Sequence, residues 1–276
     1  MKVNTLFIAL LVPCFAFAQQ DSTLTTKPQD TTTNKQEQKS SNKEKYIHKK
    51  NNIKVNLSGF AFNNYNITYE RALSNHFSIS LGYNYIPNGT FPFLDQLKNN
   101  INDANTAIGN VTLGGYAITP EVRWYAGKGL RGFYVAPYVR MSSFDVVFPG
   151  SYTITYNAPI TNTPTTQTFN VTFSGTMKAT SAGMMFGIQE RLGSSMTLDI
   201  WLIGGSYSGT TNRLNGIINP PLPNADAQAQ MENKLNSINA GPYQITGKVP
   251  TLSTAYVDIT NWYGIRGLGI TLGVKF

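Results

Sequence analysis

The chain of 276 residues has very few of the side chains on which most catalytic and metal sites depend. It contains one cysteine, Cys14, and two histidines, His48 and His76. A zinc site or a nucleophile with a histidine base needs such side chains in a cluster, and the sequence has no H-E-x-x-H motif. We therefore expect no metal, no cofactor, no catalytic residues and no disulfide, and we expect the protein not to be an enzyme.

Charged residues are also scarce, at 13% of the chain, and basic residues outnumber acidic ones by 22 to 14. From Ile53 onward the excess is small, with 14 Lys and Arg against 10 Asp and Glu. These basic residues do not gather on one element, so nucleic acid is not an expected partner. The chain also lacks the 18 consecutive apolar residues that a transmembrane helix requires.

The N-terminus has the pattern of a cleaved secretory signal over residues 1–18. Lys2 precedes a mostly apolar stretch, and Ala16-Phe17-Ala18 forms a small-residue cleavage site. Lipid attachment at Cys14 is disfavoured because Val12-Pro13 stand before it, where small residues are needed. Cleavage after Ala18 would leave an exported chain without cysteine.

Residues 19–52 consist mainly of Thr, Gln, Lys, Ser and Asn, with seven Lys and four acidic residues. A segment of this composition cannot bury enough apolar surface to fold alone. We interpret it as a disordered periplasmic spacer. The alternative is an electrostatic tether to an anionic partner through four lysines: Lys43, Lys45, Lys49 and Lys50.

From residue 53 to residue 276, apolar residues alternate with small or polar ones, which is the period of a β-strand. The alternating segments are close to the 9–11 residues that cross a membrane in a tilted barrel. We expect strands at about 53–61, 64–72, 77–86 and 113–125, from 133, up to about 192, at 196–207 and at the C-terminus. The prediction is an all-β, transmembrane, antiparallel barrel of eight strands.

One region does not fit simple alternation. Val257 and Ile259 lie at odd positions, whereas the apolar residues from Leu268 to Phe276 lie at even positions. A bulge near Gly264 or Gly267 would reconcile them, and a turn there would give ten strands instead.

The connections between the expected strands differ in length, and this orients the barrel. The turns at 73–76, 127–132 and 193–195 are short, whereas the connections at about 87–112, 149–168 and 208–254 are long. Small membrane barrels have short periplasmic turns and long extracellular loops. Both termini are therefore expected in the periplasm.

The C-terminal strand resembles the insertion signal of outer-membrane barrels, with an apolar residue at every second position up to a terminal aromatic: Leu268, Ile270, Leu272, Val274 and Phe276. Residues 53–57, 66–73 and 77–82 also resemble the opening hairpins of small, largely uncharacterised outer-membrane barrels of the eight-stranded type. The resemblance implies the outer membrane of a Gram-negative-type bacterium. It also implies outer-membrane lipid and the barrel-assembly machinery, which reads the last strand, as partners.

An eight-stranded barrel is filled by its own side chains, and seven charged residues are expected to point inward: Lys54, Glu70, Glu121, Arg123, Arg140, Asp199 and Lys275. Buried charges persist mainly when they are paired. We therefore favour a salt-bridged plug, with Glu121 bound to Arg123 or Arg140. The alternative is an ion or proton path along the same groups.

Two long connections have helical spacing. Residues 92–108 predict an amphipathic helix with an apolar stripe that includes Phe93, Leu94, Leu97 and Ile101, and residues 224–239 predict a second helix. These extracellular loop helices are expected either to cap the barrel mouth or to form a ligand surface.

Residues 151–157 and 168–173 also alternate, so they could extend two strands beyond the bilayer as an uncharged hairpin. Such an edge can recruit another strand. For the whole protein, the first interpretation is a non-enzymatic outer-membrane barrel with a structural or surface-interaction, adhesion-like role. Its partner would be an envelope or surface protein. A small-ligand binder or narrow channel with a site under the loop helices comes second, and an outer-leaflet lipid enzyme third.

Overall fold

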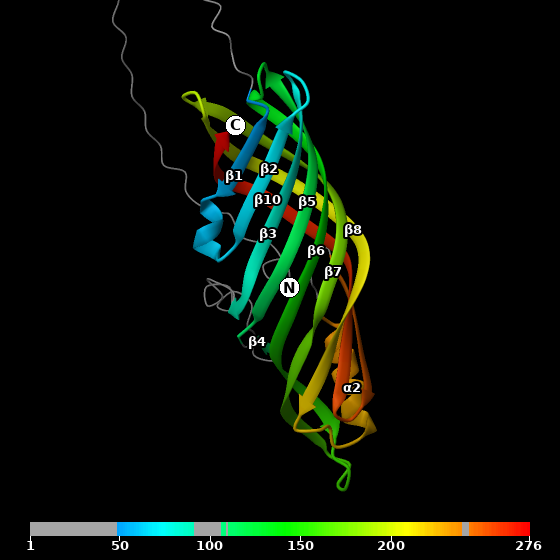
Figure 1. Cartoon of the computed structure of the whole chain (residues 1–276). Helices are drawn as coiled ribbons and strands as arrows, with labels where there is room; N and C mark the ends of the chain where they lie inside the picture. The colour runs from blue at the N-terminus through cyan, green and yellow to red at the C-terminus, as the bar shows by residue number, and fades with distance from the viewer. Residues whose placement is uncertain (1–48, 91–105, 109, 239–242) are drawn as a thin grey trace, which may run out of the picture.

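The computed structural model describes residues 49–90, 106–108, 110–238 and 243–276, and strands dominate it (Figure 1). The expected signal segment and nearly all of the expected spacer lie outside these residues. The strands are β1 (Asn51–Asn56), β2 (Tyr65–Ala72), β3 (Phe77–Thr90), β4 (Thr106–Ile108), β5 (Thr112–Gly127), β6 (Arg131–Asn157), β7 (Pro164–Leu192), β8 (Met196–Asn219), β9 (Gln244–Thr251) and β10 (Thr254–Lys275). The helices are the 3₁₀ helix η1 (Ser58–Phe62) and α2 (Ala225–Asn236).

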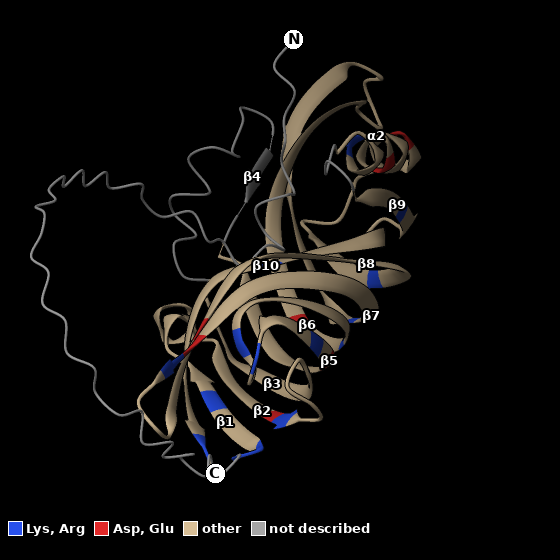
Figure 2. Cartoon of the chain, turned by 90° about the horizontal axis from the view of Figure 1, so that it is seen from above, with Lys and Arg blue, Asp and Glu red and all other residues tan. Residues whose placement is uncertain are grey.

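Eight antiparallel strands form a closed ring in the order β1-β2-β3-β5-β6-β7-β8-β10, and β10 pairs with β1 to complete it (Figure 2). The closing register joins Asn52 to Lys275 and Asn56 to Thr271. β4 and β9 lie off this ring, β4 against β6 and β9 against β10. The predicted all-β barrel of eight strands is therefore confirmed, and the ten-strand alternative is wrong for the ring.

No helix among the described residues combines the length and the apolar character needed to cross a membrane.

Four strands are much longer than the ring requires. β6, β7, β8 and β10 have 27, 29, 24 and 22 residues, and their far ends leave the barrel together with β9 and α2 (Figure 1, lower right). We call this part the extension: residues 144–177 of β6 and β7 with their turn, residues 211–238 with α2, and residues 243–260 with β9. The predicted hairpin is confirmed, but two expected loops are wrong. Only 158–163 connect β6 to β7, and β8, α2 and β9 occupy most of 208–254.

The hydrophobic face of the long strands changes sides between the barrel and the extension. In the barrel part of β7, Met184 points outward while Ser181 and Gln189 are buried inside. In its extension part, Phe169 and Val171 are buried inside, and the outward positions are mostly Thr, Ser and Asn. The barrel is thus built for an apolar surrounding and the extension for water.

This inversion also explains the change of parity that the sequence shows in β10. Val257 and Ile259 are apolar because they face the extension core, whereas Leu268 and the following even positions are apolar because they face outward. β10 does contain irregularities, at Asn261 and Leu268, whose φ angles are 66° and 49°. The side-chain alternation shifts at both, so the two shifts cancel. The irregular positions thus bracket Gly264 and Gly267.

The first strand ends earlier than the alternation predicts. β1 stops at Asn56, and residues 58–62 form η1 instead of continuing to residue 61. The Asn56 side chain accepts hydrogen bonds from the Ser58 hydroxyl at 2.7 Å and from the Gly59 N–H at 3.1 Å. A short polar side chain that bonds nearby groups in this way favours a turn over a strand.

Helix α2 confirms the prediction for 224–239 and packs inside the extension. Asn224 caps its N-terminus by accepting a hydrogen bond from the Ala227 N–H at 2.8 Å. Met231 and Leu235 are fully buried in the extension core. The other helix prediction, 92–108, lies outside the described residues except for 106–108, which form β4 and not a helix.

The polar face of α2 covers the free edge of β9. Asn236 both donates to the Gly247 carbonyl at 3.0 Å and accepts from its N–H at 2.9 Å. One turn earlier, Glu232 accepts from the Val249 N–H at 3.1 Å and from Lys248 at 2.6 Å. The hydrogen bond from Lys248 lowers the pKa of Glu232, as does the Val249 N–H. Helical side chains thus bind backbone groups that an exposed edge would offer to another strand.

We expect the substitution Asn236→Ala to open this edge. It removes both hydrogen bonds to Gly247, which should lower the local free energy of opening of β9 by about 1–3 kcal/mol. Amide hydrogen exchange at Gly247 should therefore become faster. Asn233→Ala is the matched control, because Asn233 is exposed on the same helix. Equal exchange rates in the two variants would contradict the role assigned to α2.

Candidate functional site

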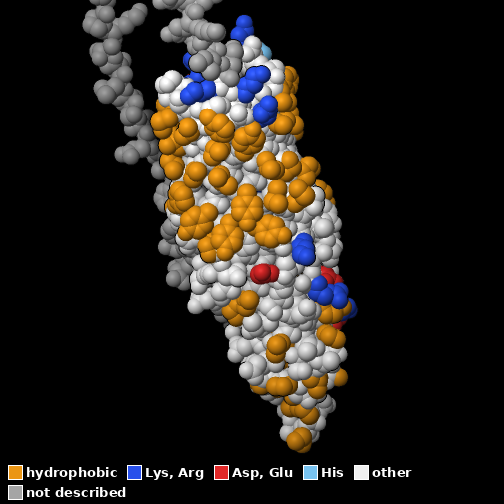
Figure 3. All heavy atoms as spheres, in the orientation of Figure 1, with side chains coloured by type: hydrophobic (Ala, Val, Ile, Leu, Met, Phe, Trp, Pro, Cys, Tyr) orange, Lys and Arg blue, Asp and Glu red, His pale blue; other side chains and the backbone are white. Residues whose placement is uncertain are grey.

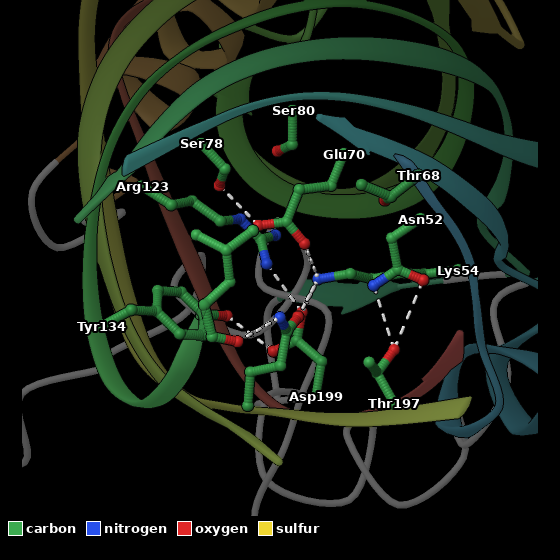
Figure 4. Close-up of polar contacts among 12 residues, drawn as sticks. Asn52, Lys54, Thr68, Glu70, Ser78, Ser80, Arg123, Tyr134, Thr197 and Asp199 are labelled. Atoms are coloured by element: carbon green, nitrogen blue, oxygen red, sulfur yellow. Dashed lines mark hydrogen bonds and ion pairs between the residues drawn. The ribbon is translucent and has the colours of Figure 1, made fainter. Parts of the chain in front are cut away.

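The barrel lumen contains six charged side chains in one connected network. Figure 4 shows the part of it around Lys54, Glu70, Arg123 and Asp199. Five of the six are residues that the sequence placed inside, and the sixth is Arg266. The members are three cations, Lys54, Arg123 and Arg266, and three carboxylates, Glu70, Glu121 and Asp199. We call them the ionic network. The charges balance within it, and every side chain except that of Arg266 is at most 1% exposed.

Lys54 and Asp199 lie at the centre of the network. The Lys54 Nζ is 2.6 Å from Glu70 Oε2 and 2.8 Å from Asp199 Oδ2, and it also donates to Gln189. Asp199 Oδ2 additionally accepts from Arg123 Nη1 at 2.7 Å. One aspartate therefore holds two buried cations.

Glu121 joins the second half of the network. Its Oε2 accepts from Arg123 Nη2 at 2.8 Å, and its Oε1 accepts from Arg266 Nη1 at 2.7 Å. The Arg266 guanidinium also lies 4.8 Å from the ring centroids of Tyr138 and Trp201, within the range of a cation–π interaction. Of the two partners expected for Glu121, Arg123 is the one that contacts it.

Neutral side chains complete the network. Tyr125 donates to Glu70 at 2.6 Å, Tyr134 donates to Asp199 at 2.8 Å, and Ser80 donates to Glu121 at 3.1 Å. With Gln189 on β7 included, each of the eight ring strands contributes a side chain. The network thus ties the whole ring together across the lumen, and each carboxylate already has a cationic partner.

Two of the residues expected in the lumen cluster stand apart from the ionic network. Arg140 faces the lumen but forms no ion pair with a described carboxylate, and its two hydrogen bonds go to Asn84 and Thr119 at 3.4 Å. Lys275 lies near the opposite end of the barrel, is 8% exposed, and likewise has no ion pair within the described ranges. Arg266, in contrast, has the even parity of the outward-facing Leu268 to Phe276, and only the shift at Leu268 turns it inward.

The other expected site residues fall into three groups. Leu268, Ile270, Val274 and Phe276 are about half exposed on the outside of the barrel, and Leu272 is half-buried there. The expected loop surface, Phe93, Leu94, Leu97 and Ile101, lies outside the described residues. His76 is in the β2–β3 turn, where its Nδ1 lies 2.9 Å from the Tyr125 carbonyl oxygen.

A cavity of about 210 Å³ lies on the extension side of the ionic network. Arg140 and Arg266 are its charged lining residues among those described, and Trp201, Trp262 and Phe144 contribute aromatic walls. The cavity shares Arg266 with the network, so the network forms its floor. No group of three or more His, Cys, Asp or Glu in the described ranges could hold a metal ion.

A family model described as "Protein of unknown function (DUF3575)" matches residues 37–216, about two thirds of the chain. The chain belongs to the DUF3575 family. The matched region ends inside β8, so α2, β9 and β10 of this DUF3575 protein lie outside the matched region. No curated protein matches the chain. Among solved structures it is similar to Acinetobacter baumannii CarO, with 12% identity and a TM-score of 0.36, over 78% of this chain and 96% of CarO. The family description names no function.

Proposed function

We propose that this DUF3575 protein is a non-enzymatic, integral outer-membrane barrel whose lumen is closed by the ionic network and whose extension is its working surface outside the cell. The inversion of the hydrophobic face along β6, β7, β8 and β10 carries this proposal. It divides each long strand into one part suited to lipid and one part suited to water.

The outside of the barrel supports contact with lipid. On the face that Figure 3 shows, a band of apolar side chains covers the barrel, with charged residues above and below it. Three tyrosines pair across neighbouring strands at the extension side of the band: Tyr65, Tyr85 and Tyr116. Phe77 and Trp124 pair at the other side. From Phe77 to Tyr85 a tilted strand rises about 20 Å, near the height of ~25 Å typical of membrane barrels between aromatic girdles.

The direction of insertion follows from the same division. The connections at the barrel end opposite the extension are short, and both described ends of the chain, Lys49 and Phe276, lie there. Small barrels keep short turns in the periplasm, so the proposal places the termini in the periplasm and the extension outside. The outward-facing C-terminal residues are then available to the assembly machinery.

The extension supports a role in surface interaction. From Ser151 to Thr172 its outward face on β6 and β7 consists of uncharged polar residues, with cross-strand hydroxyl pairs such as Thr153–Thr168 and Thr155–Thr166, both at 2.8 Å. At the hairpin tip, Ile160 is 96% exposed. Because α2 covers the β9 edge, we propose that the flat face and the tip, rather than that edge, contact an envelope or surface protein.

This role is tested with Thr153→Lys and Thr155→Lys together. Both side chains point away from the extension core, so the fold should persist while the contact face gains two charges. We expect cell aggregation, or crosslinking to a partner, to fall several-fold. Thr211→Lys is the control, because Thr211 forms a similar hydroxyl pair with Thr260 at 2.8 Å on β8 and β10.

An unchanged signal in the double variant would contradict surface interaction through this face and leave a structural role alone. Deleting the whole hairpin is a poorer test. Phe169 and Val171 pack in the same core as Met231 of α2, so the deletion would also unfold the extension.

A further inference from the structure

We propose that the cavity beside the ionic network binds a small aromatic carboxylate, with Arg140 as the residue that pairs with the carboxylate. This inference goes beyond the surface role proposed above, because it concerns the inside of the barrel. It depends on the described lining residues of the cavity and not on the extension face.

Arg140 is the arginine of the lumen whose hydrogen-bonding capacity is least used. A guanidinium has five N–H donors, and in Arg140 only Nη1 has hydrogen bonds, both at 3.4 Å and both to neutral oxygens. Arg123 and Arg266, by comparison, contact carboxylates at 2.7–2.8 Å. Arg140 is half-buried, and taking a guanidinium even partly out of water with such weak partners is costly. An anionic ligand would supply the missing acceptor.

The surroundings of Arg140 hold its side chain in place. Asn84 Oδ1, which accepts from Arg140, also accepts from Asn66 Nδ2 at 3.0 Å. The Asn84 amide in turn donates to Asn64 Oδ1 at 3.1 Å. This chain of amides keeps one edge of the guanidinium fixed, and a planar carboxylate matches the geometry of the remaining donors.

The walls of the cavity favour a flat apolar body on the ligand. Trp201, Trp262 and Phe144 line it together with Ile86 and Leu113. The indole Nε1 of Trp201 is buried without a hydrogen-bond acceptor among the described residues, so a ligand oxygen would satisfy it. The volume of about 210 Å³ lies below the roughly 300–1,000 Å³ of sites for drug-sized ligands.

The charges that line the cavity favour a ligand with a single negative charge. Arg266 is already paired with Glu121 at 2.7 Å, which leaves Arg140 as the described lining cation without a carboxylate. A phosphate dianion would exceed this one charge, because the remaining polar lining residues are neutral amides and hydroxyls and supply no second unpaired cation. A carboxylate with an aromatic ring satisfies both the cation and the walls.

The test is a titration of the full-length protein in detergent with benzoate, followed by tryptophan fluorescence. The chain has three tryptophans: Trp201 and Trp262 line the cavity, and Trp124 is on the outside, 45% exposed. A Trp124→Phe background therefore restricts the signal to the cavity. Benzamide has the same ring without the charge, and inorganic phosphate has the charge without the ring.

We expect saturable binding of benzoate, and affinities at least about 10-fold lower for benzamide and phosphate. Arg140→Gln should weaken benzoate binding by about 10- to 100-fold, as expected for a charged hydrogen-bond partner. Arg71→Gln is the control, because Arg71 is exposed on the outer face of β2 and should leave binding unchanged.

Asn84→Asp gives an independent test that keeps Arg140. The new carboxylate would pair with Arg140 inside the barrel, although it gives up the hydrogen bond to Asn64, so benzoate binding should fall as much as in Arg140→Gln. Equal binding of benzoate and benzamide would indicate partition into the micelle and overturn the proposal. Benzoate affinity that neither variant changes would overturn it as well.

Discussion

Replacing Asp199 with alanine is expected to lower the free energy of unfolding by about 3–5 kcal/mol, the typical loss when one partner of a buried ion pair is removed. The reason is that Asp199 holds both Lys54 and Arg123, at 2.8 and 2.7 Å, and all three side chains are 0% exposed. The substitution leaves an excess of positive charge where water cannot solvate it. Urea unfolding of the protein in lipid vesicles, followed by fluorescence, measures the loss.

The control for this prediction is Asp145→Ala, which removes an exposed aspartate bound to the Thr176 hydroxyl at 2.6 Å and should cost about 1 kcal/mol or less. Planar-bilayer recordings separate the two interpretations of the network. A structural plug predicts no conductance steps in the wild type and a large loss of stability in Asp199→Ala. Equal stability of the two variants, with altered ion flux in Asp199→Ala, would instead indicate an ion path.

Alternation along the strands was sufficient to place most of the lumen charges. Lys54, Glu70, Glu121 and Arg123 lie on strands whose inward and outward positions alternate without interruption around them, so counting by twos locates them. Asp199 lies on β8, where the alternation changes between Trp201 and Gly204, but counting from the start of the strand at Met196 reaches Asp199 before that change. Arg266 could not be found in this way. The irregularities at Asn261 and Leu268 reverse the alternation only for the residues between them. Arg266 therefore points inward, although its position has the parity of the outward-facing Leu268.

The sequence predicted the hairpin of the extension but not that its apolar face packs into a protein core. Alternation shows that one face of a strand is apolar but not whether that face meets lipid or a protein core. In β10 the odd apolar positions of the extension and the even apolar positions of the barrel belong to opposite faces. A switch of the apolar residues from even to odd positions can therefore mark a bulge. It can equally mark the membrane boundary, where the apolar face turns from the outside of the barrel to the inside of the extension.

The separation of Arg140 from the ionic network shows a second limit of the sequence. Parity predicts that Arg140 points inward, as it does, but not its height in the barrel relative to the carboxylates. That height depends on the stagger between strands, which pairs β6 with β5 so that Tyr138, not Arg140, lies opposite Glu121. Arg140 therefore lines the cavity and does not pair with those acids.

The last prediction concerns the outer face of the barrel. Leu81 is 51% exposed in the middle of β3, between Tyr69 of β2 and Pro120 of β5. If the apolar band meets hydrocarbon, Leu81→Arg places a charge near the bilayer midplane. Folding into vesicles should then become less favourable by about 2–4 kcal/mol. Leu202 is less suitable, because it lies where the pairing of β7 with β8 shifts register.

Leu252→Arg is the matched control for Leu81→Arg, because Leu252 is 39% exposed in the turn between β9 and β10, within the extension. An arginine there stays in water, so its effect on folding should be within about 0.5 kcal/mol. The comparison uses the same substitution on the two sides of the proposed membrane boundary. Equal folding of both variants into vesicles would mean that the apolar band does not face lipid, and the outer-membrane proposal would have to be abandoned.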